Sequence, residues 1–117
     1  MCAWKFLPAL AAGNVIIHKP SEETPLSILK FCEIFDKAGF PKGIFNVVIG
    51  VGAIAGKALA MHNEVDCISF TGSVPVARDI LKSCSESNLK KVNYLFFMKA
   101  CFLDAFRTWR KSSSYNI

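Results

Sequence analysis

The stretch Cys67–Val74, Cys-Ile-Ser-Phe-Thr-Gly-Ser-Val, joins an apolar strand to the start of a helix, and it decides the fold. At such a junction the N–H groups of the first helical turn have no partner, and the positive end of the helix dipole points the same way. Gly72 allows close backbone approach, and Ser73 can cap the helix or donate its hydroxyl. The junction therefore predicts an anion site, with phosphate as the first candidate. Gly-Ser before a helix is also commonly a simple cap, and that alternative stays open.

Strands and helices alternate on both sides of this junction. Val15–Ile17 predicts a short strand buried on both faces. Thr24 is the expected N-cap, and Pro25 the expected first residue, of a helix that ends near Ala38. The apolar stripe of that helix is Ile28, Phe31, Cys32, Phe35 and Ala38. Further strands are expected at Ile44–Ile49, at Cys67–Phe70 and from Lys90, and further helices at Ala3–Ala12, Ala53–Met61 and Val74–Cys84. This alternation predicts an α/β fold, a partial Rossmann-like parallel sheet with flanking helices.

Several polar and small residues follow directly after the expected strands. Lys19, Glu22, Gly50, Gly52 and Ser73 all lie there. Ligands of parallel sheets bind beyond the carboxyl ends of the strands, so we expect these residues to meet at one sheet edge. That convergence strengthens the prediction of a binding site.

The amino-acid composition excludes several classes of protein. The chain has 117 residues, of which 52% are hydrophobic and 20% charged, so it is not disordered. It contains no apolar run of about 20 residues and no signal peptide, which argues against a membrane span. Basic and acidic residues are interspersed through residues 1–92, so we expect no nucleic-acid partner.

The five cysteines are odd in number and widely spread, and no pair has C-x-x-C spacing. We therefore expect no metal site and a reducing compartment, which predicts a cytoplasmic protein.

Seven stretches occur with the order and spacing of one known family. They are Ala3–Lys5, Pro8–Asn14, His18–Leu26, Lys37–Pro41, Gly43–Val48, Ile68–Ser73 and Ser87–Val92. Through them, residues 1–92 resemble part of the cofactor-binding domain of the aldehyde dehydrogenase superfamily. Members of that family oxidise aldehydes to carboxylic acids with NAD or NADP through a cysteine intermediate. The resemblance implies an oxidoreductase ancestry, and it implies nicotinamide dinucleotide as the ligand.

The resemblance also assigns roles to individual residues. Lys19 and Glu22 correspond to the groups that hold the adenosine ribose, and Gly72 and Ser73 to those that meet the pyrophosphate. The predicted cofactor-binding residues are Lys19, Ser21, Glu22, Gly52, Gly72 and Ser73. The Glu22 carboxylate would repel a 2′-phosphate, so NAD is expected over NADP. Alternatively, Lys19 and Glu22 only solvate the loop between strand and helix.

The resemblance stops after Val92. Leu95 stands where the family has its general-base glutamate, and Cys101 lacks the surroundings of the family's nucleophile. We therefore predict no catalytic residue, a chain that is inactive alone, and weak cofactor binding. The family's oligomerising strands are also absent from the matched sequence, and the aldehyde substrate is left undetermined. A shifted reading frame, a retained intron or an alternative exon would each explain a truncated domain.

Residues 93–117 form a divergent aromatic and basic tail. They hold seven of the fourteen aromatic residues and four basic residues against one acidic residue. We expect a helix that frays toward the end. An alternative function follows from this composition, namely a non-enzymatic interaction protein whose tail docks on a partner or, less favoured, on a membrane surface.

Overall fold

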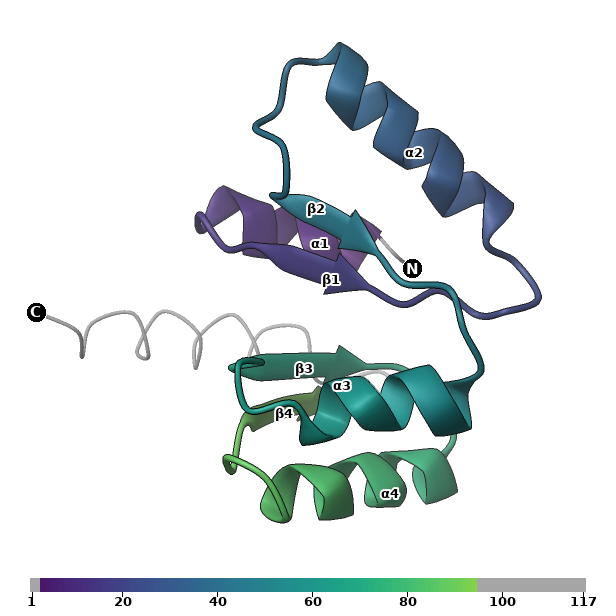
Figure 1. Ribbon diagram of the computed structural model, residues 1–117, viewed down its shortest axis with the longest axis vertical. Helices are drawn as coiled ribbons and strands as arrows, with labels where there is room; N and C mark the ends of the chain where they lie inside the picture. Colours follow the sequence, from purple (N-terminus) through teal and green to yellow (C-terminus); the bar gives the residue numbers. More distant parts are fainter. Residues whose placement is uncertain (1–2, 95–117) are drawn as a thin grey trace, which may run out of the picture. The chain divides into compact units, whose positions relative to one another are not determined.

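The computed structural model describes residues 3–94, which divide into two compact units after Leu59 (Figure 1). We call the described residues 3–59 unit 1 and residues 60–94 unit 2. Each unit contains one pair of parallel strands with helices beside it. The predicted α/β class with parallel strands is confirmed, and the four strands pair as two separate two-stranded sheets.

Unit 1 contains helices α1 and α2 and the pair β1–β2. In chain order these elements are α1 (Ala3–Ala11), β1 (Ile16–His18), α2 (Leu26–Lys37) and β2 (Phe45–Val47). In the parallel pair, Ile16 lies opposite Phe45 and His18 opposite Val47. A π-helix, η1 (Gly52–Gly56), follows and continues into α3 (Lys57–Met61), which crosses the boundary between the units.

An aromatic cluster forms the core of unit 1. Phe6 of α1 lies with its ring 5.0 Å from that of Phe31 and 5.2 Å from that of Phe45. Phe35 of α2 stacks on Phe45, with ring centroids 5.2 Å apart. The predicted stripe of α2 is confirmed for Ile28, Phe31 and Phe35, which belong to this core or pack against it. Cys32 is half-buried, and Ala38 is exposed.

The predicted strand Val15–Ile17 is wrong in its start and in its burial. The strand begins one residue later, at Ile16, and Val15 is exposed. Ile16 and Phe45 pack against the core, whereas Ile17 points the other way and is 48% exposed. Because successive strand residues alternate between faces, one face of β1 is covered within unit 1 and the other is not.

The predicted start of α2 is also wrong by one residue. Pro25 is the N-cap, and its carbonyl oxygen accepts a hydrogen bond from the Leu29 N–H at 3.2 Å. Within residues 3–94 no side chain caps this helix, so Thr24 does not have the expected role. The predicted helix from Ala53 likewise begins one residue earlier, as the π-helix.

Unit 2 contains β3 (Cys67–Phe70), α4 (Val74–Ser85) and β4 (Lys91–Tyr94), and its strands pair in parallel with Cys67 opposite Lys91. The predicted strand Cys67–Phe70 is confirmed. The helix α4 ends at Ser85, one residue beyond its expected end. The strand β4 includes Asn93 and Tyr94, so the prediction of a helical tail is wrong for these two residues. The remainder of the predicted tail, with Leu95 and Cys101, lies outside the described residues, and the boundary after Val92 stays a prediction.

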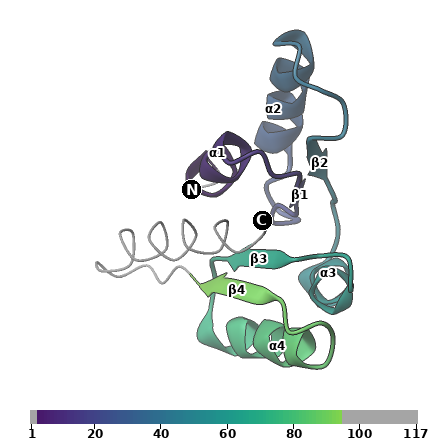
Figure 2. The same ribbon diagram turned by 90° about the vertical axis from the view of Figure 1, so that its left-hand side faces the viewer.

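A buried lysine connects the end of α3 to the turn before β4. The Lys90 ammonium donates to the Ala60 carbonyl oxygen at 2.6 Å and to Ser87 Oγ at 2.7 Å. These bonds satisfy a carbonyl at the C-terminal end of a helix, where a positive charge is favourable. Figure 2 shows α3 and α4 beside the β3–β4 pair. No helix among residues 3–94 is long and apolar enough to cross a membrane.

Candidate functional site

Lys19, the first residue after β1, connects two loops of unit 1. Its Nζ donates to the Pro20 carbonyl oxygen at 2.8 Å and to the Gly50 carbonyl oxygen at 2.9 Å. Gly50 follows β2, so the side chain bridges the carboxyl ends of two parallel strands. The ammonium group is thus held by main-chain oxygens, and its side chain is only 18% exposed.

Glu22 lies in the same turn with its carboxylate partly in solvent. Glu22 Oε2 is 3.7 Å from Lys19 Nζ, and the Glu22 side chain is 47% exposed. The turn is closed by Ser21, whose Oγ accepts a hydrogen bond from the Glu23 N–H at 3.4 Å. The structure therefore brings Lys19, Ser21 and Glu22 together, and leaves the carboxylate accessible to a hydroxyl-bearing ligand.

The glycines after β2 differ in what surrounds them. A Cβ at Gly50 would lie 2.9 Å from the Ala55 Cβ, so this glycine allows the close packing of η1. A Cβ at Gly52 would meet no atom of the described chain within 4 Å. Gly52 is therefore an open position that a ligand can approach, whereas Gly50 is needed for packing within unit 1.

In unit 2, Ser73 is the N-cap of α4 but does not cap it with its side chain. Its backbone is extended, with φ −74° and ψ 153°, and its hydroxyl makes no cap hydrogen bond within the described part of the chain. Ser73 thus has the N-cap position that the helix-cap alternative expects, without the side-chain hydrogen bond of a cap. Pro75, in the first turn, has no N–H to offer. The donors left at this end are the Ser73 hydroxyl and the remaining N–H groups of the first turn.

A side chain at Gly72 would require the Phe70 ring to move. A Cβ there would lie 2.5 Å from Cζ of the Phe70 ring, well inside van der Waals contact. The Gly72 carbonyl oxygen accepts a hydrogen bond from the Tyr94 hydroxyl at 2.7 Å. The backbone at the end of β3 is thus packed against one ring and hydrogen-bonded to another.

Sequence reasoning missed Thr71 as a site residue. Its Oγ1 is buried and has no hydrogen-bond partner among the described residues. A buried hydroxyl without a partner costs free energy unless a ligand or water satisfies it, which makes Thr71 a candidate contact. The sequence signal that could have identified Thr71 is its position between an apolar strand and Gly72-Ser73.

The predicted site residues fall in both units. Lys19, Ser21, Glu22 and Gly52 belong to unit 1, and Gly72 and Ser73 to unit 2. Their expected meeting at one sheet edge stays a prediction.

His18 lies beside Lys19 and is packed against an aromatic ring. It stacks on Phe45 with centroids 6.2 Å apart. Burial, together with the positive charges of Lys5 and Lys19, lowers the pKa of His18 below its ordinary value. The imidazole is therefore held in its neutral form near the turn that carries Glu22.

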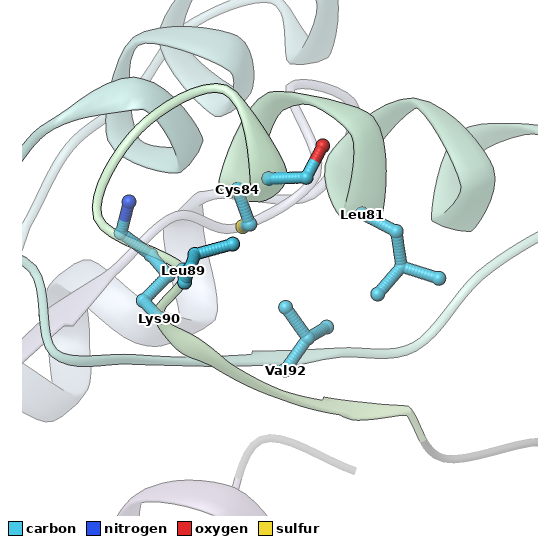
Figure 3. A pocket seen from close by; sticks show the side chains of 6 residues that line it. Leu81, Cys84, Leu89, Lys90 and Val92 are labelled. Carbon is cyan, nitrogen blue, oxygen red and sulfur yellow. The ribbon is translucent and has the colours of Figure 1, made fainter.

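A separate groove of about 230 Å³ lies between α4 and β4. Figure 3 shows Leu81 and Val92 pointing toward each other across it, with Cys84 at its side. Burial raises the pKa of the Cys84 thiol, which keeps the thiol protonated. None of the predicted site residues lines this groove. Across residues 3–94 there is also no group of three or more His, Cys, Asp or Glu side chains that could hold a metal ion.

Comparison with known proteins matches residues 1–96 to the Aldehyde dehydrogenase family. The chain is 52% identical over 93 residues to human mitochondrial 10-formyltetrahydrofolate dehydrogenase, covering 80% of this chain and 10% of that protein. It is 50% identical over 92 residues to an aldehyde dehydrogenase of Agaricus bisporus, covering 79% of this chain and 18% of that protein. The crystal structure of PnpE in complex with nicotinamide adenine dinucleotide matches with a TM-score of 0.76 and 53% identity, covering 80% of this chain and 19% of that one.

The chain thus spans only 10% to 19% of the length of these three relatives. The family match nevertheless covers most of its residues, and it includes every predicted site residue. This chain belongs to the aldehyde dehydrogenase family.

Proposed function

We propose that this chain supplies part of the nicotinamide dinucleotide site of an aldehyde dehydrogenase. The whole family's reaction is the oxidation of an aldehyde to a carboxylic acid, and the nicotinamide ring accepts the hydride when the dinucleotide is bound. A related structure, that of PnpE, contains nicotinamide adenine dinucleotide, which supports this ligand class. The residues of the two turns carry the more detailed proposal.

The turn after β1 is suited to a ribose. The Glu22 carboxylate is half in solvent and can accept hydrogen bonds from vicinal hydroxyls. Lys19 holds the turn against the Gly50 carbonyl and keeps one donor close to the same position. Open space at Gly52 leaves room for the rest of the adenosine.

The turn after β3 is suited to a phosphate. One observation carries the proposal: Ser73 is the N-cap of the 12-residue helix α4, and its hydroxyl makes no cap hydrogen bond within the described residues. A serine there is free to donate to an oxyanion, and the helix dipole favours the negative charge. Gly72 leaves room for the Phe70 ring beside the turn, and Thr71 adds an unsatisfied hydroxyl.

We further propose that NAD binds in preference to NADP. A 2′-phosphate on the ribose would lie against the Glu22 carboxylate, and two negative groups at that distance repel each other. The Lys19 ammonium, 3.7 Å from Glu22 Oε2, keeps its positive charge and offsets part of this repulsion.

The isolated 117-residue chain is proposed not to oxidise aldehydes, because Leu95 cannot accept a proton and no activated thiol is present in the described residues. A cytoplasmic location remains part of the proposal. The alternative role, docking through residues 93–117, rests on residues that lie almost entirely outside the described structure.

The test is an amide NMR titration of the purified chain with millimolar NAD. We expect resonances of the turns around Glu22 and Ser73 to shift, and those of Ser73 to stop shifting in Ser73→Asp. Ser85→Asp is the matched control, because it adds the same charge at the other end of the 12-residue α4, about 18 Å away along the helix. A folded chain that does not respond to NAD, or that responds equally in both variants, would contradict the proposal.

The cofactor preference has its own comparison. In Glu22→Gln the carboxylate charge is lost and the shape is kept. We expect the ratio of NAD to NADP affinity to fall toward one in this variant. An unchanged ratio would show that Glu22 does not set the preference.

A further inference from the structure

Tyr94, the last residue of β4, contacts the turn proposed to bind phosphate. It lies opposite Phe70 in the parallel pair, with ring centroids 5.7 Å apart and an angle of 35° between the rings. Its hydroxyl reaches past Phe70 and donates to the Gly72 carbonyl oxygen at 2.7 Å. The strand pairing, the ring contact and the hydrogen bond place one side chain against one peptide group.

The peptide group between Gly72 and Ser73 is therefore fixed on one side. The Phe70 ring also packs closely on Gly72, since a Cβ there would lie 2.5 Å from Cζ of the ring. A trans peptide is planar, and its N–H points away from its C=O. By holding the Gly72 carbonyl, Tyr94 sets the direction in which the Ser73 N–H points. A hydrogen bond to the carbonyl also polarises the same peptide and makes its N–H a stronger donor.

We propose that Tyr94 is a positioning residue for the phosphate-binding turn. It orients the Ser73 N–H and hydroxyl toward the anion without touching the ligand itself. This proposal rests on the function proposed above, because it needs the turn to bind the pyrophosphate. Tyr94 lies two residues before the end of the family match, which covers residues 1–96.

The experiment compares the full chain with Tyr94→Phe, which removes the hydroxyl and keeps the ring beside Phe70. We expect the dissociation constant for NAD to rise by about 2- to 10-fold, the range for loss of one hydrogen bond. Adenosine carries no phosphate, so its affinity should not change. Tyr115→Phe, the same substitution at the chain's other tyrosine, is the matched control and should leave both affinities unchanged.

An equal loss of NAD and adenosine affinity in Tyr94→Phe would mean a general structural role and would overturn the proposal. So would unchanged NAD affinity. If the unaltered chain does not respond to NAD at all, the proposed function fails, and the ligand-free spectrum then decides the positioning role. We expect the Gly72 carbonyl-carbon and Ser73 amide-nitrogen resonances to move in Tyr94→Phe and not in Tyr115→Phe. Resonances that stay in place would refute the positioning role independently of the ligand.

Discussion

Replacing Lys19 with methionine tests the contact that connects the two strand ends of unit 1. Methionine keeps most of the apolar stem and removes the ammonium group. The change eliminates the hydrogen bonds to the carbonyl oxygens of Pro20 and Gly50, at 2.8 and 2.9 Å, and the ion pair with Glu22 at 3.7 Å. The two carbonyls lose a charged donor in a region that is only partly open to water.

The expected cost follows from these three contacts. A hydrogen bond from a charged donor contributes about 1.5 to 3 kcal/mol, and water recovers part of this at a half-open site. The ion pair adds about 1 kcal/mol or less, because the Glu22 carboxylate is nearly half exposed and therefore screened. The total is about 2 to 4 kcal/mol. A unit of this size is stable by only about 3 to 9 kcal/mol, so the loss is large.

The assay is a urea titration followed through the amide resonances of β1 and β2. With a slope of about 1 kcal/mol per M, the midpoint of unit 1 should fall by about 2 M or more. Lys30→Met is the matched control, because Lys30 also pairs with a glutamate three residues later but is 68% exposed and donates only to that glutamate among the described residues. If Lys19→Met and Lys30→Met lower the midpoint equally, the Gly50 contact does not stabilise the unit and the reasoning is refuted.

Three further predictions concern the core, the turn glycines and pH. Phe6→Ala should destabilise unit 1 by about 3 to 5 kcal/mol and collapse the dispersion of the β1 and β2 amides, and retained dispersion would contradict the assigned core. Gly72→Ala should disturb the resonances of its turn and weaken NAD binding, because the new Cβ meets the Phe70 ring at 2.5 Å. Gly52→Ala should leave the fold intact, because its Cβ meets nothing within 4 Å of the described chain. Equal effects of the two substitutions on folding would rule out the steric explanation. The pKa of His18 in the folded chain is lowered from its ordinary value of 6.5. As the pH falls below 6.5, the imidazole of the unfolded chain is therefore protonated before that of the folded chain, and unit 1 loses stability until the folded imidazole is protonated as well. Urea midpoints of unit 1 at about pH 7.5 and pH 5 measure this loss, which should be smaller in His18→Gln.

The elements of unit 2 could be predicted closely because their signals are local. Cys67–Phe70 is a short apolar run between turn residues, and the helix after it begins with Ser-Val-Pro. The stripe of α2 was equally readable, since residues at helical spacing report which face is buried. The family resemblance of the chain depended on these same stretches, and the match over residues 1–96 confirms it.

The contacts that give the site its geometry could not be predicted. Lys19 and Tyr94 both donate to glycine carbonyls, 31 and 22 residues away in sequence. A carbonyl oxygen is present at every residue, so the sequence carries no signal for which one a side chain will reach. The late start of α2 has a similar cause, because Thr24 and Pro25 are both acceptable at a helix start and only the backbone decides between them.

Each parallel pair is formed by strands that lie close together in the sequence, and this affects how the chain folds during its synthesis. Unit 1 ends at Leu59, and its strands pair through residues that all precede that point. At about 5 to 20 residues per second, the ribosome needs about 0.5 to 2 s to add the residues from Ala60 to Phe70, the end of β3. Helix formation takes microseconds or less, so α1 and α2 have time to form before β3 is complete. Val15 and Ile17 are exposed apolar side chains of this unit. The nascent chain should therefore be a good substrate for chaperones that bind apolar segments.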